Sequence, residues 1–338
     1  ATLSVAQTGN IGQGFRITYD TSKVCFISKV NSSTSFNVVT ATGGTPSNEA
    51  SAVTVNSIRA DYASLSAAEA GASDSAHLNT SNLTTGSHIL NLVCYAGAAD
   101  GSFVLSGFDT DDDNYVKIYV PPAHRHSGKF DNEKYRIQST DWYITRSTLD
   151  KAVFDGLQII DGSSSVVTHI WGAGTLLIAK DCIVVREYPG DLGSTGISGA
   201  VQAENCIAIG FITKSGTSGN GFYLNNTEGL YAYNCIAYGG YQGIRVGGNL
   251  PILKNCAAFG STDADISSYS THNAASDYNA SGNTTPPGSH SVDLSSYTAA
   301  QIWTDVDNGD FSLVSGSPLI GEGTDLSAYF TTDIAGTT

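Results

Sequence analysis

Short runs of hydrophobic residues, rich in β-branched and aromatic side chains, alternate with turn residues through most of this chain. Typical runs are Ile183–Val185, Ile207–Ile209 and Ile236–Tyr238, and a glycine directly follows the last two. No helix fits between these runs, because they are too short and too closely spaced for a 3.6-residue period to develop. The pattern therefore predicts strands that end in turns.

A cysteine preceded by Asn or Asp begins such a run four times, and successive cysteines lie 24, 29 and 21 residues apart. Repeats of this length are typical of solenoids. A second phrase, Gly-Phe-Tyr-Leu at 221–224, returns as Gly-Ile-Arg-Val at 243–246, so each turn carries at least two strands. The sequence therefore predicts a parallel β-helix, in which each coil adds one rung to two or three parallel sheets.

Equivalent side chains of a parallel β-helix stack from coil to coil. The cysteines would form an inward ladder that fills a narrow core, and the asparagines would lie at a bend where their amides bond between coils. A metal or redox array of cysteines is the alternative, but the chain has no CxxC pair and rung spacing does not build a tetrahedral ligand shell. The predicted ladder consists of Cys182, Cys206, Cys235, Cys256, Asn205, Asn234 and Asn255.

The remainder of the chain divides around this stack. Residues 1–58 alternate hydrophobic and polar positions without the Asn-Cys phrase, which predicts a small antiparallel β-module. Residues 61–70 carry the one helical pattern, with Asp61 as N-cap and Gly71 as the stop, and we expect this helix to cap the first coil. The β-helix is predicted over residues 59–338, with about ten coils in 88–321. Its closing rung would lie at Asp310–Leu313 with residues 317–321, and a tail over 322–338 would leave the stack.

The chain is strongly acidic, with a formal net charge of −15, and 41% of its residues are hydrophobic. The hydrophobic content excludes a disordered chain, and the charge argues against nucleic acid, an anionic membrane surface or an acidic substrate as partner. No apolar run reaches about 18 residues, so we expect no membrane insertion. The cysteines do not form a secreted disulfide framework, since Cys25 and Cys94 are isolated from the other four.

The motifs resemble a known group, the right-handed parallel β-helix proteins of tailed bacteriophages of aquatic bacteria and of bacteria that secrete long repetitive surface proteins. The resemblance covers about residues 60–338 and implies the right-handed fold. It is a poor guide to activity, because the same scaffold carries lyases, hydrolases, adhesins and inert virion parts. For residues 1–58, where no motif matches, it implies a virion attachment module by analogy only. Besides the Asn-Cys coils, it rests on the segments 61–65, 69–70, 115–119, 124–128, 134–137, 316–321 and 333–336.

Two clusters of polar residues suggest chemistry. Asp109, Asp111 and Asp113 offer hard oxygen ligands for Ca²⁺, the one cofactor considered, although a solvated acidic turn is the alternative because the glycine and glutamate of an EF-hand are missing. His124, Arg125 and His126 combine groups suited to acid–base work or to a sugar carboxylate, and the alternative is that they pin a long loop to the stack.

Carboxylates at Asp155, Asp161 and Asp181 lie on or near predicted strands, where a glycoside hydrolase would need two or three on adjacent rungs. The carboxylate and histidine motifs of pectin-degrading β-helix hydrolases and the basic cluster of the lyases are missing. We therefore assign no catalytic residue.

Four tyrosines, Tyr231, Tyr233, Tyr238 and Tyr241, crowd into neighbouring coils and could present an aromatic strip to a saccharide. Strand alternation turns about half of such side chains inward, so stacking between coils is the alternative.

These observations predict an all-β protein, a right-handed parallel β-helix with an N-terminal capping helix and a small N-terminal β-module. We expect a non-enzymatic structural protein on the surface of a tailed-phage virion, as a capsid decoration or a fibre or tail component. Its partners would be other virion proteins and copies of itself in a symmetric homo-oligomer. The alternative is a tailspike-like or secreted, extracellular protein that binds or degrades a surface polysaccharide.

Overall fold

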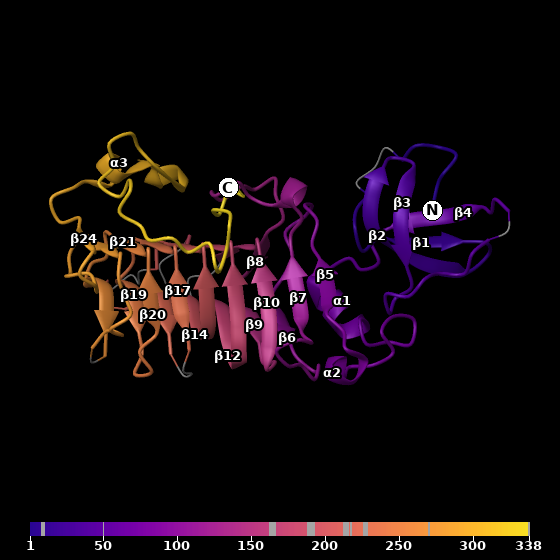
Figure 1. Ribbon diagram of the computed structural model, residues 1–338, viewed down its shortest axis with the longest axis horizontal. Coiled ribbons are helices and arrows are strands. Elements are labelled where there is room, and N and C mark those ends of the chain that lie inside the picture. The colour runs from indigo at the N-terminus through magenta and orange to yellow at the C-terminus, as the bar shows by residue number, and fades with distance from the viewer. Residues whose placement is uncertain are drawn as a thin grey trace.

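The chain forms a small antiparallel β-module followed by a parallel β-solenoid of about 7 turns (Figure 1). The computed structural model describes residues 1–7, 11–49, 51–161, 167–187, 193–211, 216, 218–225, 229–269 and 271–336. The all-β class and the parallel solenoid are confirmed. The expected number of about ten coils is too high, because long connections before β8 (Ile137–Ser139) and the residues after β24 (Val292–Asp293) add no rungs.

The N-terminal module is a four-stranded antiparallel sheet of strand order β3-β2-β1-β4. Alternate side chains such as Phe15, Ile17 and Ile27 pack with Phe36 into a core of the module's own. The predicted small β-module is therefore present. Its strands are β1 (Arg16–Tyr19), β2 (Lys23–Ser32), β3 (Ser35–Val39) and β4 (Val55–Arg59).

Two short helices, α1 (Leu65–Gly71) and α2 (Leu83–Gly86), close the first coil. Their leading leucines are buried in the solenoid core, as expected for a cap. The helix starts later than predicted, because Ser64 is the N-cap and its side chain accepts a hydrogen bond from the Ala67 amide at 3.1 Å. Asp61 lies before the helix and pairs with other side chains.

The solenoid has two parallel sheets, which we call the broad sheet and the narrow sheet. Each coil runs through the broad sheet and then turns into the narrow sheet. The broad sheet has twelve strands: β5 (Leu90–Val93), β6 (Phe103–Leu105), β7 (Val116–Tyr119), β9 (Tyr143–Ser147), β10 (Lys151–Asp155), β12 (Thr168–Lys180), β14 (Thr195–Glu204), β16 (Asn220–Leu224), β17 (Tyr231–Tyr233), β19 (Gln242–Val246), β20 (Ile252–Lys254) and β22 (Ala264–Ser268). The narrow sheet has eight: β8, β11 (Gln158–Asp161), β13 (Ile183–Val185), β15 (Ile207–Ile209), β18 (Ile236–Tyr238), β21 (Ala257–Phe259), β23 (Ala280–Ser281) and β24.

The Asn-Cys phrase lies at the bend between the two sheets. Asp181, Asn205, Asn234 and Asn255 have φ of 51°, 51°, 55° and 53°, a left-handed conformation that Asn and Asp adopt more readily than most residues. The Asn205 amide donates to Asp181 Oδ1 at 3.0 Å, and the Asn234 amide donates to Asn205 Oδ1 at 2.7 Å. The amides therefore link successive coils.

The following cysteines are free thiols and point into the core, where each is at most 1% exposed. Cys206 Sγ lies 3.3 Å from the Ala179 carbonyl oxygen, and Cys256 Sγ lies 3.1 Å from that of Ala232. Both carbonyls belong to the preceding coil, so the thiols fill the core beside the bend. Burial raises the pKa of Cys182, Cys206 and Cys235 well above the usual value, which keeps these thiols protonated and unreactive.

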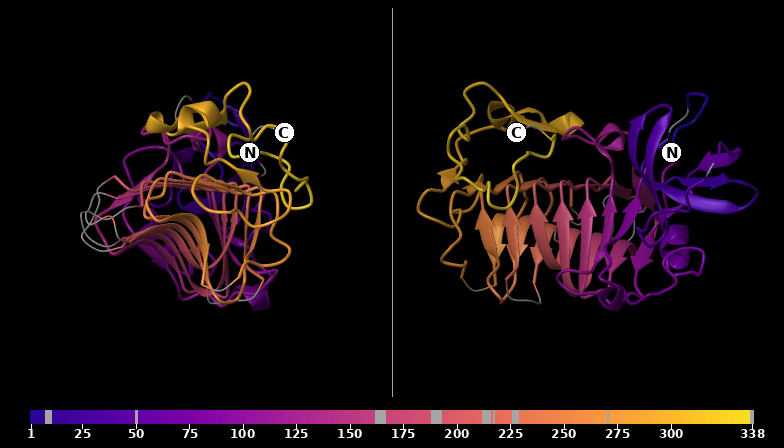
Figure 2. Two further views of the ribbon diagram at one scale, coloured as in Figure 1. Left: turned by 90° about the vertical axis from the view of Figure 1, so that its left-hand side faces the viewer. Right: turned by 45° about the vertical axis from the view of Figure 1, so that its right-hand side comes forward.

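The C-terminal part of the chain lies over the outer face of the narrow sheet, as Figure 2 shows in yellow. It contains α3 (Ala299–Ile302), β25 (Trp303–Asp305), the 3₁₀ turn η2 (Val306–Asn308) and β26 (Asp310–Leu313). β26 pairs antiparallel with β25 in a separate two-stranded sheet, so it is not the closing rung that the sequence suggested.

The C-terminal tail does not leave the stack. The Asn255 side chain accepts from the Thr324 amide at 2.9 Å and donates to the Thr324 carbonyl at 2.8 Å, and the Asn205 amide donates to the Thr332 carbonyl at 2.9 Å. The tail therefore runs back along the asparagines, and residues 337–338 of the predicted tail lie outside the described residues. No helix in the described part of the chain has the length and apolar character needed to cross a membrane.

Candidate functional site

Residues 124–126, the candidates for acid–base chemistry, fasten their loop to the solenoid. The Arg125 guanidinium pairs with Asp155 through Nη2 and lies 3.2 Å from Asp181 Oδ2 through Nη1. His126 is buried, and its Nε2 donates to the Asp181 carbonyl oxygen at 2.8 Å while its Nδ1 accepts from the Gly128 amide at 3.3 Å. Burial lowers the pKa of His126 to about 4, so the ring is neutral at pH 7 and serves as a structural bridge.

The three candidate carboxylates are also engaged. Lys117 Nζ lies 2.9 Å from Asp155 Oδ2, whereas Arg125 pairs with the other oxygen, Oδ1. Asp161 is fully buried, pairs with Arg186 and accepts from the Glu187 amide at 2.8 Å. Burial raises the pKa of Asp181, even though Asn205 and Arg125 oppose that shift. None of the three is left as an unpaired general base.

The acidic turn before β7 uses its carboxylates locally. Asp111 Oδ1 accepts from the backbone amides of Asp113 and Asn114 at 2.9 and 2.7 Å, and these bonds, led by that of the Asn114 side chain, lower the pKa of Asp111. Asp109 Oδ2 accepts from the Asn82 side chain at 3.0 Å. In the described ranges, no group of three His, Cys, Asp or Glu side chains is placed to hold a metal ion. Calcium binding at this turn stays a prediction.

The four tyrosines proposed as a saccharide strip lie in different places. Tyr231 and Tyr233 stack on β17 with ring centroids 4.2 Å apart, and Tyr329 of the tail packs edge-on against Tyr233 at 4.8 Å. Tyr238 is on the narrow sheet, and Tyr241 precedes β19 of the broad sheet. The fold brings the first two together and does not join them to the others.

Tyr238 packs beneath the C-terminal cover, with its ring 5.5 Å from Phe311 and 6.1 Å from Trp303. It therefore belongs to the apolar layer between the narrow sheet and that cover. The pattern that explains this is visible in the sequence, because Ile236–Tyr238 is apolar at all three positions and so must be covered on both faces.

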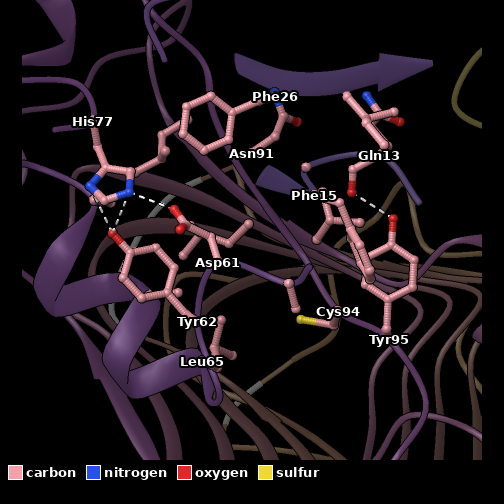
Figure 3. Close-up of a pocket in the computed structure, with 18 of the residues that line it drawn as sticks. Gln13, Phe15, Phe26, Asp61, Tyr62, Leu65, His77, Asn91, Cys94 and Tyr95 are labelled. Carbon is pink, nitrogen blue, oxygen red and sulfur yellow. Dashed lines mark hydrogen bonds and ion pairs between the residues drawn. The ribbon is translucent and has the colours of Figure 1, made fainter. Parts of the chain in front are cut away.

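A cavity of about 1060 Å³ lies where the N-terminal module meets the first coil (Figure 3). Its walls include Phe15 and Phe26 from the module, Leu65 from α1, and Cys94 and Tyr95 just after β5. Apolar walls with a few polar groups are typical of binding pockets.

Three polar side chains meet in this cavity. His77 Nε2 lies 2.5 Å from Asp61 Oδ2, and the Tyr62 hydroxyl lies 3.0 Å from His77 Nδ1 (Figure 3). Asp61 Oδ1 lies 3.3 Å from Arg16 Nη1 on β1. Because Arg16 belongs to the module and His77 to the segment between the capping helices, Asp61 ties the two bodies together.

The phenols of Tyr62 and Tyr95 and the thiol of Cys94 are neutral at pH 7. Burial raises the pKa of both Tyr62 and Cys94 to about 12, and it also raises the pKa of Tyr95, whose hydroxyl donates to the Gln13 carbonyl at 2.6 Å. Neither the thiol nor the phenols are activated as nucleophiles. The arrangement is suited to docking the module onto the solenoid, and sequence reasoning missed it because His77 lies in an irregular segment with no local pattern.

Sequence reasoning also missed an aromatic strip on the outer face of the broad sheet. Trp171 stacks on Tyr143 with centroids 4.4 Å apart, and the Arg146 guanidinium lies 4.4 Å from the centroid of the Trp171 ring. Further along the solenoid, the Arg245 guanidinium lies 4.2 Å from the ring of Tyr269 and 5.3 Å from that of Tyr223.

The cluster around Trp171 and the cluster around Arg245 lie along one column, a line of residues that runs across the strands of the broad sheet. β9, β12, β14, β16 and β19 pair in parallel register, which places Arg146, Trp171, Ser198, Tyr223 and Arg245 opposite one another in that order. A signal for half of this column was present in the repeat of 221–224 at 243–246, which aligns Tyr223 with Arg245.

Comparison with known proteins adds no assignment, because the chain matches no protein-family model, no curated protein and no solved structure.

Proposed function

We propose that this chain is a non-enzymatic structural protein that attaches through residues 1–58 to a larger particle and projects its solenoid outward. The observation that carries the proposal is that the best candidates for catalysis are engaged in holding the fold together. Arg125 and His126 pin a loop to Asp155 and Asp181, and Asp161 is buried against Arg186.

The shape of the molecule supports attachment at one end. The module has its own core and lies at one end of the elongated solenoid (Figure 1), so it can contact a surface while the coils extend away. The resemblance to phage β-helix proteins favours the surface of a tailed-phage virion, as a capsid decoration or a fibre or tail component. Copies of the chain would then be arranged symmetrically among other virion proteins.

Cysteine labelling tests the attachment. All six native cysteines are buried, so a thiol introduced at Val30 in the module, which is 41% exposed, would be labelled selectively. The matched control is Ile320→Cys in the C-terminal segment, where the side chain is 56% exposed. We expect both variants to react in the free protein, and only Ile320→Cys to react on the native particle. Equal labelling of both on the particle, or the absence of a particle-bound form, would contradict the proposal.

A second candidate function is polysaccharide binding, in a tailspike-like or secreted setting. The observation that favours it is the strip of aromatic and arginine side chains along the outer face of the broad sheet. Binding is favoured over degradation, because the candidate carboxylates are held in ion pairs.

A further inference from the structure

We propose that the outer face of the broad sheet binds a carboxylate-bearing, acidic polysaccharide that lies along the solenoid axis. The proposal rests on the second candidate function and deepens it by naming the ligand class and the residues that recognise it. Those residues are Tyr143, Arg146, Trp171, Ser198, Tyr223, Arg245 and Tyr269.

The strip has the dimensions of a short oligosaccharide. Arg146 and Arg245 are separated by four rungs of a parallel sheet, which corresponds to about 19 Å at a rung spacing of about 4.8 Å. Both ends of this span carry an arginine over aromatic rings. An extended sugar chain laid along the axis would therefore meet two similar platforms in succession.

The rung between the two platforms carries the small Ser198, and we call the space over this residue the slot. Tyr143 and Arg146 contact the Trp171 ring from the preceding rung, and on the following rung the indole edge approaches Gly199, next to Ser198. Within the described ranges, no other aromatic or cationic side chain contacts Trp171. Trp171 and Tyr223 are two rungs, about 10 Å, apart, which leaves space for one flat ring between them. A pyranose ring presents C–H groups on its faces, and these pack well on aromatic rings.

The positive charge of Arg146 and Arg245 favours sugars that carry a carboxylate. Arg125 and Arg186 pair with carboxylates, whereas among the described residues no carboxylate lies within ion-pair distance of Arg146 or Arg245. A guanidinium stacked on an aromatic ring keeps its N–H edge free for a bidentate bond to a carboxylate. The net charge of −15 disfavours acidic ligands over most of the surface, so this strip is a local exception.

A second column, three positions earlier on the same strands, supplies polar groups. Thr168, Thr195, Asn220 and Gln242 lie opposite one another on successive rungs. The threonine hydroxyls and the Asn220 amide suit sugar hydroxyls, whereas the Gln242 amide already donates to Asp263 Oδ2 at 2.8 Å. A second copy of the chain is a less suitable occupant, because a stable protein interface needs about 800 Å² per partner around an apolar centre. This face is a narrow aromatic line bordered by polar residues.

The test is calorimetric titration of the full chain with size-defined acidic oligosaccharides from polygalacturonate, alginate, hyaluronan and polysialic acid, and with neutral oligomers of the same lengths. We expect at least one acidic oligomer to bind more tightly than its neutral counterpart. The double variant Arg146→Gln/Arg245→Gln should bind it about tenfold or more weakly, as expected for anchor residues of an interface. Ser198→Trp, which fills the slot, should also abolish tight binding. The charge-matched control is Lys29→Gln/Arg59→Gln in the module, which should bind normally.

The outcomes distinguish polysaccharide binding in general from the recognition of acidic sugars by the arginines. Equal binding of acidic and neutral oligomers would overturn the role of the arginines and leave polysaccharide binding standing. No binding to any oligomer would overturn both. Unchanged affinity in Ser198→Trp would overturn the slot. Light scattering tests whether a second copy of the chain occupies this face instead. If the wild-type protein is an oligomer and Trp171→Ala converts it to monomers, the face is an interface between copies, and the proposal is overturned.

Discussion

The two sheets of the solenoid have similar, apolar inner faces, but their outer faces differ in residue type. On the inside, side chains such as Phe154 of the broad sheet and Val184 of the narrow sheet join one continuous core. On the outside, the narrow sheet is apolar and is covered by the chain's own C-terminal segment. The broad sheet carries charged, polar and aromatic side chains, and among the described residues no apolar segment covers its column from Arg146 to Arg245. A single fold thus has one face for stability and one for contact.

The difference lies in the outward positions of each strand. Ile183–Val185 and Ile207–Ile209 are apolar at all three positions, so both of their faces must be removed from water. In the broad sheet, the outward positions opposite one another in β10, β12 and β14 are Asp155, Lys180 and Glu204. Polar partners meet these charges: Asp155 pairs with Arg125 and Lys117, and the buried Glu204 pairs with Lys180. Outer-face composition therefore decides what kind of cover each sheet takes.

The largest effect should come from breaking the cover of the narrow sheet. Trp303 is 1% exposed and packs against Phe311, Tyr238 and Phe259. Trp303→Ala should lower the free energy of unfolding by about 3–5 kcal/mol, as for other buried tryptophans, measured by denaturant titration.

The matched control uses the same substitution beside the broad sheet. Trp142 is 71% exposed and directly precedes β9, so Trp142→Ala should change stability by less than about 0.5 kcal/mol. Similar losses of stability in the two variants would contradict the difference between the two outer faces.

Acid should loosen the loop that carries His126, in which Phe130 packs with Ile183 on the outer face of the narrow sheet. The pKa of His126 is lowered to about 4 in the folded protein, so the unfolded chain takes up a proton near pH 6.5 that the folded chain resists. This contribution is fully present above pH 6.5 and is lost as the pH falls from 6.5 to 4, by about 3 kcal/mol. His169, with a pKa of about 3, acts in the same direction.

The pH dependence of unfolding in wild type and His126→Gln measures this contribution. Glutamine can still donate to the Asp181 carbonyl but does not titrate, so the variant should lose less stability between pH 6.5 and 4. Hydrogen exchange should rise in Ile183–Val185 before it rises in Asn220–Leu224. Identical pH profiles for the two proteins would rule out His126 as the source.

A smaller effect should follow from releasing the tail. Asn255→Gly removes both side-chain bonds to Thr324, while glycine tolerates the φ of 53° at this position. We expect a loss of about 1–2 kcal/mol and faster proteolysis near Thr324. Asn234→Gly is the control, because the hydrogen bond that its amide donates runs to Asn205 of the preceding coil. If the control alone exposes the tail to protease, Asn255 does not hold it.

The repeat was predictable from sequence because its residues are constrained locally. Asn205 and Asn234 need a left-handed bend, and the following cysteines need a narrow core, so identity and spacing carry the signal. The antiparallel module was predictable for the same reason, since alternation within each strand marks it.

The covers and the docking of the module were not predictable to the same extent, because their contacts join distant segments. Trp303 meets Tyr238 across 65 residues of chain, and the pairing of Asp61 with Arg16 and His77 joins two bodies. Local capping rules favoured Asp61 as N-cap, but Ser64 is the residue placed to accept from the helix. Sequence could indicate that the narrow sheet needs a cover, but not which segment supplies it.

The smallest expected effect concerns calcium at the acidic turn, which precedes β7 of the broad sheet and approaches β10 through Lys151, whose Nζ donates to the Asp112 carbonyl at 2.6 Å. Asp111 Oδ1 already accepts three hydrogen bonds within the turn, so an ion bound by this oxygen would compete with them. Even at about ten times its Kd, calcium would add only about 1.4 kcal/mol to stability. Thermal melts in calcium and in chelator, for wild type and Asp113→Asn, measure this. We expect calcium to raise the melting temperature by much less than this bound implies. A larger, calcium-specific rise that Asp113→Asn removes would mean that an ion, in place of a protein cover, stabilises this side of the broad sheet.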